Sequence, residues 1–255
     1  MRIARVAHGG AIAFAVIEDD VAAELDGPPI GALRFTGNRV PLQECRLLAP
    51  VLPSKVVAVG KNYAEHAAEF GSEVPSQPLI FLKPSTAVIG QGDAIRKPAG
   101  LVRLDHEAEL VIVIAGLVRN ADEQTAENAI LGYTCGNDVS ARDYQASDGQ
   151  WARAKGFDTF CPLGPWIETD LDPAKLRVQS RVNGAVRQDA STADMVFRPA
   201  FLVSYVSKIM TLLPGDAIMT GTPAGVGPME PGDTVEIEIE GIGTLSNPVI
   251  AAGDK

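Results

Sequence analysis

The chain has 255 residues, of which 46% are hydrophobic and 21% are charged, which is the composition of an ordinary globular protein. Its formal net charge of −10 at pH 7 argues against a nucleic-acid-binding protein, because binding to phosphates requires a basic surface. No apolar run reaches the roughly 18 to 20 residues that span a bilayer, and the first residues lack the pattern of a secretory signal. We therefore expect no membrane partner and a cytoplasmic location.

The start of the chain is predicted to form a small β-rich domain. Ile3 to Arg5 and Ala11 to Ile17 have the pattern of a hairpin around a Gly-Gly turn. A proline-containing connector follows, and we place a domain boundary in it. The sequence is thus divided into a small domain over residues 1–50 and a larger domain over residues 55–252.

The larger domain is predicted to be strand-rich, with short helices at its margins. Val56 to Gly60 is predicted to be a buried strand, and Lys61 to Phe70 a short helix. Pro75, Pro78 and Pro84 then interrupt the chain, which is typical of a mobile lid over a site. Further elements are predicted at Glu107 to Ala115 (strand), Asp122 to Leu131 (helix with its N-cap at the first residue), Leu176 to Arg187 (hairpin with an Asn-Gly turn), Pro199 to Met210 (helix) and Thr234 to Glu240 (strand).

Two acidic side chains are predicted to share one face of a strand. Residues two apart in a strand point to the same side, so Glu107 and Glu109 project together while Ala108 and Leu110 face the other way. Adjacent carboxylates at the edge of a buried strand repel each other and lose solvation, and a divalent cation would offset both costs. Asp138, which follows another apolar strand, is the candidate third ligand. Oxygen ligands with no nearby cysteine favour Mg²⁺ or Mn²⁺, with Ca²⁺ as a possible substitute, over zinc.

An E-x-E pattern by itself is more typical of a solvated strand face, so the metal prediction depends on the surrounding motifs. Several blocks resemble the fumarylacetoacetate hydrolase family and follow its order over roughly residues 55 to 250. Each block is weak alone, but together they are highly specific. The blocks are Val59 to Glu69, Phe81 to Ser85, Gly132 to Asp143 with Gln145, Lys155 to Thr159 with Pro162 to Trp166, and Leu213 to Asp216 with Thr220 to Gly227.

The resemblance implies an α+β, β-rich fold: a mixed β-roll or sandwich with peripheral helices, a small N-terminal domain and a homodimeric assembly. It also implies one Mg²⁺ or Mn²⁺ ion on the positions that match Glu107, Glu109 and Asp138, in agreement with the same-face interpretation. Water and substrate would complete the coordination of these three protein ligands.

An acid–base pair is predicted upstream of the carboxylates. His66 and Glu69 are three residues apart, so on a helical turn they share a face, and Glu69 could orient His66 as a proton carrier. On spacing alone, a solvent-exposed ion pair fits better. The resemblance instead implies a catalytic dyad on a lid over the metal.

Substrate-binding residues are predicted in the remaining motifs. Arg142 and Gln145 follow Asp138 by four and seven positions, so a helical stripe would direct all three toward one site. The three carboxylates carry more charge than one dication, so an anionic substrate also needs nearby cations. Lys155, in a glycine-flanked loop, is expected to be catalytic. An ordinary surface cation is the alternative for each basic residue.

A glycine-rich loop and one further lysine complete the predicted substrate site. Gly221 could bring a backbone N–H close to a carboxylate, and Thr222 could add a hydroxyl donor. A plain tight turn is the alternative. The match of Lys83 to a family motif adds it to the predicted substrate-binding set.

The resemblance implies a metal-dependent enzyme that converts small anionic 2-oxo acids through an enolate. His66 and Glu69 favour C–C bond hydrolysis or decarboxylation of acylpyruvate- or oxaloacetate-type substrates. The alternative reaction is keto–enol or double-bond isomerisation of aromatic catabolites of the 2-hydroxyhepta-2,4-diene-1,7-dioate type. A non-catalytic metal-binding module is the alternative from another class, and phosphoester hydrolysis is less favoured because basic phosphate clamps are scarce.

Overall fold

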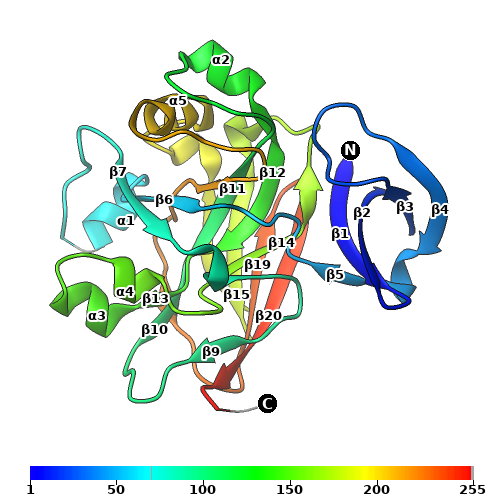
Figure 1. Cartoon of the computed structure of the whole chain (residues 1–255). Coiled ribbons are helices and arrows are strands. Elements are labelled where there is room, and N and C mark those ends of the chain that lie inside the picture. Colours follow the sequence, from blue (N-terminus) through cyan, green and yellow to red (C-terminus); the bar gives the residue numbers. More distant parts are fainter. Residues whose placement is uncertain (70, 254–255) are drawn as a thin grey trace.

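The computed structural model describes residues 1–69 and 71–253, and its N-terminal part confirms the predicted hairpin (Figure 1). The first strands are β1 (Arg2–His8), β2 (Ala11–Glu18), β3 (Val21–Leu25), β4 (Phe35–Pro41) and β5 (Arg46–Leu48). β1 and β2 pair in antiparallel register, with Ala4 opposite Ala15, and both side chains are buried. This part of the chain therefore buries its own small apolar cluster.

The central sheet continues from these strands into the larger part of the molecule. It adds β6 (Val56–Gly60), β7 (Leu79–Lys83), β8 (Val88–Ile89), β11 (Ala108–Ile114), β12 (Ile130–Asn137), β14 (Cys161–Glu168) and β17 (Ala217–Met219). Its order is β4-β3-β2-β1-β14-β12-β11-β17-β6-β7, with β5 attached to β1 and β8 to β14. Every residue of β11 is buried, because the strand lies in the middle of this sheet with structure on both faces. The division into domains over residues 1–50 and 55–252 stays a prediction.

A second sheet covers the central one and closes the main core. Its strands are β9 (Ile95–Lys97), β15 (Arg177–Val182), β16 (Ala185–Ser191), β19 (Thr234–Ile239) and β20 (Gly243–Ala251), in the order β16-β15-β19-β20-β9. Leu110 and Ile112 of β11 belong to the same buried cluster as Val178 and Ile237 of this sheet. The predicted alternation in β19 and the hairpin at Asn183-Gly184, where both residues have positive φ, are confirmed. A small third sheet contains β10 (Leu104–His106), β13 (Ser140–Ala141) and β18 (Gly227–Pro228).

Five short α-helices lie at the margins of the sheets in the described residues. They are α1 (Ala64–Glu69), α2 (Glu123–Asn128), α3 (Arg142–Ser147), α4 (Ala152–Lys155) and α5 (Pro199–Ile209). α5 packs beside α2 at the top of Figure 1, whereas α1, α3 and α4 lie on the left, near β7 and β13. The strand-rich architecture with peripheral helices confirms the expected α+β, β-rich class.

Several predicted element ends and one loop assignment differ from the structure. The predicted N-cap Asp122 precedes α2 as expected, but the helix ends at Asn128 rather than Leu131, because β12 already begins at Ile130. The predicted end of the first helix at Phe70 lies outside the described residues. Lys155 is the last residue of α4 and does not lie in a loop.

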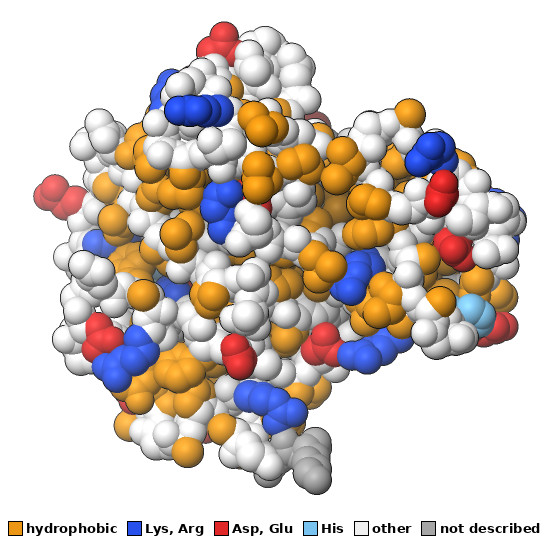
Figure 2. Space-filling model, in the orientation of Figure 1, with side chains coloured by type: hydrophobic (Ala, Val, Ile, Leu, Met, Phe, Trp, Pro, Cys, Tyr) orange, Lys and Arg blue, Asp and Glu red, His pale blue; other side chains and the backbone are white. Residues whose placement is uncertain are grey.

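Among residues 1–69 and 71–253, no helix has the length and hydropathy needed to cross a bilayer. Figure 2 shows that basic and acidic side chains are interspersed on the face in view, with hydrophobic side chains between them. The homodimer and the cytoplasmic location stay predictions.

Candidate metal and substrate site

The three predicted carboxylate ligands meet where β11 begins and β12 ends. Ala108 pairs with Asn137 in antiparallel register, and the Asp138 N–H donates to the Glu107 carbonyl at 3.0 Å. One carboxylate oxygen each of Glu107, Glu109 and Asp138 lies within 4.8 Å of the others, and all three side chains are buried. The predicted convergence of the three residues is therefore present in the structure.

Glu107 reaches this position from a break in the predicted strand. β10 ends at His106 and β11 starts at Ala108, so Glu107 lies between the two strands. Its N–H donates to the Asn137 side-chain oxygen at 2.9 Å instead of to a strand partner. The single strand predicted from Glu107 onwards was wrong at its first residue, although the carboxylates of Glu107 and Glu109 still converge.

Two buried lysines contact the carboxylates from one side. Lys155 Nζ lies 2.8 Å from Glu107 Oε2 and 2.5 Å from Asp138 Oδ2, and Lys83 Nζ lies 2.5 Å from Asp138 Oδ1. Burial lowers the pKa of Lys155, but the charges of Asp138 and Glu107 outweigh it, so the pKa lies above its usual value. Burial raises the pKa of Glu107, and the charges of Lys155 and Arg142 more than reverse this and bring it below its usual range. These groups are therefore held in their charged forms.

Glu109 lacks such a counter-charge. Within the described part of the chain no ion pair involves Glu109, and its Oε2 accepts the Gly221 N–H at 2.6 Å. Burial, followed by the charges of Asp138 and Glu107, raises the pKa of Glu109 well above its usual value. A divalent cation beside Glu109 would remove this electrostatic cost.

The donor set fits a hard divalent cation. Glu107, Glu109 and Asp138 offer only carboxylate oxygens, and Mg²⁺ and Mn²⁺ prefer such ligands. Each carboxylate oxygen has further acceptor capacity beyond one lysine hydrogen bond, so the lysine contacts do not exhaust the ligands. These three residues could therefore hold one such ion.

Arg142 and Gln145 meet beside the carboxylates, although by a different route from the one predicted. Arg142 Nη2 lies 2.7 Å from Glu107 Oε1, its Nε donates to Asp105 at 2.8 Å, and its Nη1 donates to Gln145 at 2.6 Å. The helical stripe that was to include Asp138 was wrong, because α3 starts only at Arg142. The intervening strand β13 pairs with β10 and brings the helix to the site.

The predicted acid–base pair lies on α1. His66 Nδ1 is 3.1 Å from Glu69 Oε2, and Glu69 Oε1 accepts the Gly225 N–H at 3.3 Å. The His66 side chain is 10% exposed, whereas that of Glu69 is 33% exposed. His66 thus faces the interior, with Glu69 between it and the loop that contains Gly225.

One cavity of about 520 Å³ joins these groups. The cavity is lined by most of the residues that the sequence predicted for the site, which are His66, Glu107, Glu109, Asp138, Arg142, Gln145, Lys155 and Thr222. The remaining predicted residues lie behind this lining: Lys83 is fully buried against Asp138, Gly221 holds Glu109 through its backbone, and Glu69 contacts His66. The cavity is also lined by residues that were not predicted to belong to the site: Val59, Gly60, Lys61, Ala67, Ser72, Phe81, Arg103, Ala146, Trp151.

Thr222 is held in place by a glutamine that the sequence did not reveal. The Thr222 hydroxyl donates to the Ala108 carbonyl at 2.9 Å and accepts from Gln188 Nε2 at 2.7 Å. Gln188 Oε1 also lies within hydrogen-bonding distance of the Ala108 N–H and His106 Nδ1. Gln188 lies far from the other site residues in the sequence and in no motif, so no local signal marked it.

Gly221 occupies a backbone position that other residues rarely adopt. Its φ is +98°, and an added Cβ would lie 2.7 Å from the Asn62 Cβ and 3.1 Å from the Val59 carbonyl. Gly221→Ala should therefore move the N–H away from Glu109 and weaken Mn²⁺ binding by about 10- to 100-fold, as loss of an outer-shell partner does. Titration calorimetry with Mn²⁺ would measure this.

Gly227→Ala, at the start of β18 just after this loop, is the matched control, because its added Cβ would meet only His106 Nε2 at 3.7 Å, an ordinary contact. Equal Mn²⁺ affinity for the Gly221→Ala variant and the wild-type protein would contradict the proposed support of Glu109 by this backbone.

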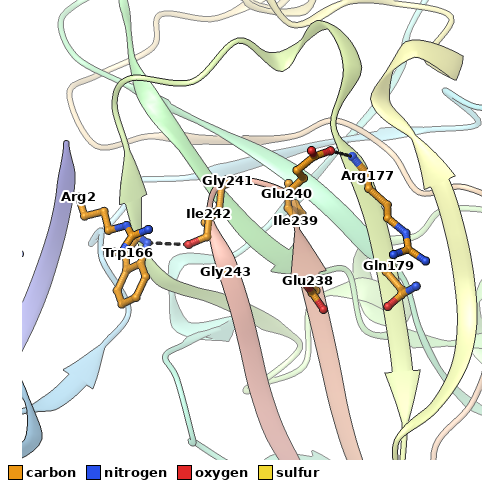
Figure 3. Close-up of a pocket in the computed structure, with 10 residues that line it drawn as sticks. All are labelled: Arg2, Trp166, Arg177, Gln179, Glu238, Ile239, Glu240, Gly241, Ile242 and Gly243. Atoms are coloured by element: carbon orange, nitrogen blue, oxygen red, sulfur yellow. Dashed lines mark hydrogen bonds between the residues drawn. The ribbon is translucent and has the colours of Figure 1, made fainter. Parts of the chain in front are cut away.

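A second cavity, of about 540 Å³, is lined by residues of β1, β14 and β15 and of the turn between β19 and β20, and it has different chemistry (Figure 3). Trp166 Nε1 donates to the Ile242 carbonyl at 2.8 Å, and the Arg177 N–H donates to Glu240 at 3.1 Å. The only candidate metal cluster within residues 1–69 and 71–253 is the one at Glu107, Glu109 and Asp138. The candidate functional site is therefore the cavity beside α1 and α3.

Comparison with known proteins gives the same assignment for most of the chain. A family model described as fumarylacetoacetate (FAA) hydrolase C-terminal matches residues 55–250, and one described as Rv2993c-like, N-terminal, matches residues 1–50. The structure of 2-hydroxyhepta-2,4-diene-1,7-dioate isomerase from Mycobacterium marinum is 52% identical, with a TM-score of 0.93 and 100% coverage of both chains.

Two further relatives have other named activities. Maleylpyruvate hydrolase from Sphingobium, solved with manganese(II) and pyruvate, is 31% identical, with a TM-score of 0.81 over 98% of this chain and 99% of that chain. The mitochondrial oxaloacetate tautomerase fahd2 of Xenopus laevis is 42% identical over 80% of this chain and 68% of that protein. The chain therefore belongs to the fumarylacetoacetate hydrolase family, whose members are enzymes.

Proposed function

We propose that this protein is a Mg²⁺- or Mn²⁺-dependent enzyme that cleaves a C–C bond of small 2-oxo acids by hydrolysis or decarboxylation. The observation that carries this proposal is that His66, paired with Glu69, faces the same cavity as the buried carboxylates of Glu107, Glu109 and Asp138. A proton carrier and a cation site in one cavity are what this chemistry needs. The manganese and pyruvate bound to the Sphingobium relative support it by similarity.

The charge balance of the cavity supports an anionic substrate. The carboxylates of Glu107, Glu109 and Asp138 are matched by as many cations, which are Lys83, Arg142 and Lys155. Addition of a dication would leave an excess of positive charge, which an anion can neutralise. Lys83, Arg142 and Lys155 therefore supply the positive charge that an anionic substrate needs beside the three carboxylates.

The residues of the chain have separate roles in this proposal. A bound dication would polarise the 2-oxo group as a Lewis acid. Glu69 orients the His66 ring, so that His66 can take a proton from water or from the substrate. Lys155 and Arg142 present donors toward the carboxylates and the cavity, where they can stabilise negative charge that develops on the substrate. Lys83, which does not line the cavity, positions Asp138 through its contact with Asp138 Oδ1.

Isomerisation is the second candidate function. It is favoured by the 52% identity to the named isomerase of M. marinum and by the similarity to the oxaloacetate tautomerase of X. laevis. It uses the same cation site and proton carrier but breaks no C–C bond. A non-catalytic metal-binding module is the candidate from another class.

One assay separates these candidates. The purified protein with Mn²⁺ is offered oxaloacetate, acetylpyruvate and a hydroxymuconate-type dienol, while the enol absorbance and the release of pyruvate are followed. Pyruvate supports C–C cleavage, and loss of enol absorbance without pyruvate supports isomerisation. The absence of any change supports the non-catalytic module.

His66→Ala is expected to reduce acylpyruvate hydrolysis by about 100- to 10,000-fold, which is the usual contribution of a general acid or base. Mn²⁺ affinity should stay near the wild-type value, because His66 is not among the three converging carboxylates. Steady-state kinetics and calorimetric titration would measure the two effects.

His8→Ala, at the exposed end of β1, is the control for loss of a histidine. Wild-type hydrolysis by the His66→Ala variant would show that the dyad assignment is wrong.

A further inference from the structure

Arg103 is a cation of the cavity wall for which the proposed chemistry has no role. It precedes β10, and its backbone is fixed at both ends: its N–H donates to Asp143 at 3.2 Å, and its carbonyl accepts the Arg142 N–H at 3.0 Å. Its side chain is 49% exposed, in contrast to the other arginine of the cavity, Arg142, at 10%. Arg103 thus offers the cavity a cation that solvent can reach.

The guanidinium of Arg103 is oriented and only partly used. Nε and Nη2 donate to the two oxygens of Asp105 at 2.8 and 2.9 Å, and the Asp105 side chain is completely buried. Nη1 has no hydrogen-bond partner within the described residues, so its N–H groups are available to an incoming anion. A guanidinium held in this way loses little conformational entropy when it binds a second carboxylate.

Asp105 also links Arg103 to the candidate metal ligands. Arg142 donates to Asp105 Oδ2 at 2.8 Å and lies 2.7 Å from Glu107 Oε1. A continuous chain of ionic contacts therefore runs from the solvent-exposed Arg103 through Asp105 and Arg142 to the buried Glu107. Arg103 stands at the outer end of this chain, and the candidate cation site stands at the inner end.

The wall of the cavity suits a short carbon chain between two polar ends. Trp151 packs edge-to-face on Phe81, with ring centroids 5.2 Å apart. A Cβ on Gly60 would lie 2.7 Å from the Trp151 ring, so the indole packs directly on the backbone. Because Gly60, Phe81 and Trp151 all line the cavity, part of its surface is apolar.

Charge balance distinguishes a singly from a doubly anionic substrate. The charged side chains that line the cavity, or pair with its lining, are evenly divided between cations and anions. The cations are Lys61, Lys83, Arg103, Arg142 and Lys155, and the anions are Glu69, Asp105, Glu107, Glu109 and Asp138. With a dication bound, two negative charges on the substrate would restore neutrality.

We propose that Arg103 binds a second carboxylate at the end of the substrate remote from the cation site, so that the enzyme prefers 2-oxo acids that are dicarboxylates. This inference rests on the proposed function, because it takes the substrate's 2-oxo acid end to lie at Glu107, Glu109 and Asp138. Arg103 then acts as a specificity residue and not as a proton carrier.

The test compares two substrates that differ only in the distal charge: succinylpyruvate and its distal methyl ester, with Mn²⁺ present. Arg103→Gln should lower the ratio of kcat/KM for the diacid to kcat/KM for the ester by about 10- to 100-fold, the range for loss of a charge-assisted hydrogen bond. The change should lie mainly in KM. Arg103→Lys, which keeps the charge, should recover part of the ratio.

A purely structural role of Arg103 predicts a different result. If Arg103 only holds Asp105, both substrates lose activity together, and an unchanged ratio overturns the proposal. Arg177→Gln is the control. Arg177 is exposed, pairs with Asp189 and lines the other cavity, so its loss should not change the ratio of kcat/KM values.

A binding measurement separates this proposal from the proposed function. Trp151 lines the cavity, so fluorescence of a Trp166→Phe protein reports binding of either compound, even if neither is turned over. Tighter binding of the diacid with no turnover would support the Arg103 subsite and contradict the hydrolase proposal. Equal affinities of the diacid and the ester would overturn the Arg103 subsite regardless of how any variant folds.

Discussion

Glu109→Gln is expected to abolish Mn²⁺ binding and turnover, and at the same time to make the metal-free protein more stable at neutral pH. The amide is close in shape to the carboxylate and can still accept the Gly221 N–H, but it removes one of three converging ligand charges. The affinity loss should exceed the roughly 10- to 100-fold that removal of an outer-shell partner costs, because a direct ligand is lost.

The gain in stability follows from the raised pKa of Glu109. Burial and the neighbouring Asp138 and Glu107 raise this pKa in the folded, metal-free protein, so folding favours the protonated form. The unfolded chain releases its proton near the usual carboxyl value, about 4.3. The metal-free protein therefore loses stability as the pH rises from that value through the raised pKa of Glu109. Glutamine cannot titrate and removes this loss.

Thermal unfolding at pH 5 and pH 8, in EDTA and in Mn²⁺, measures these effects together. In EDTA, the wild-type Tm should fall between pH 5 and pH 8 by more than that of the Glu109→Gln variant. Mn²⁺ should stabilise only the wild-type protein. Glu236→Gln, on the outer face of β19, is the matched control. A Glu109→Gln variant that still binds Mn²⁺ with wild-type affinity would refute the carboxylate site.

Local patterns predicted the parts of the fold and site that depend on neighbours in the sequence. The Asn183-Gly184 hairpin and the alternation in β19 follow from turn chemistry and side-chain periodicity. Glu107 and Glu109 were also found this way, because they are two residues apart. Asp138 was proposed because it follows an apolar strand, and the family motifs supported it, although its position beside Glu107 depends on strand pairing and not on local pattern.

Residues whose roles come from long-range contacts were missed. Gln188 reaches Ala108 across 80 positions of sequence, and Asp105 reaches Arg142 across 37, with no periodic pattern at either end. Nothing in the sequence distinguishes Arg103 from an ordinary surface arginine, because its role depends on the contact with the buried carboxylate of Asp105. Tertiary contacts also changed the expected position of Lys83, which lies behind Asp138 rather than in the cavity lining.

Lys155→Met is expected to give a protein that binds Mn²⁺ more tightly than the wild type but turns over substrate about 100- to 1,000-fold more slowly. Lys155 is 2% exposed and contacts both Glu107 and Asp138, so its charge repels a cation that approaches the same carboxylates. Methionine fills a similar volume without charge. Cation binding should therefore improve, while the donor that faces the substrate cavity is lost.

The same substitution should strongly destabilise the metal-free protein. Removal of one partner from a buried ion pair leaves an uncompensated charge and costs about 3–5 kcal/mol of unfolding free energy. Lys83 and Arg142 remain beside Asp138 and Glu107 and can reduce this cost, but neither replaces the bridge that Lys155 makes between the two carboxylates. Because Mn²⁺ supplies the missing charge, it should restore much of the lost stability.

Urea unfolding with EDTA or Mn²⁺, calorimetric titration and steady-state kinetics measure these three quantities, and Lys208→Met on the exposed side of α5 is the control. A merely structural lysine would lower stability and activity without improving metal affinity. Tighter Mn²⁺ binding together with lost turnover would instead place Lys155 both against the cation site and in the chemistry. Unchanged metal affinity in a folded Lys155→Met protein would show that the cation does not bind between Glu107 and Asp138.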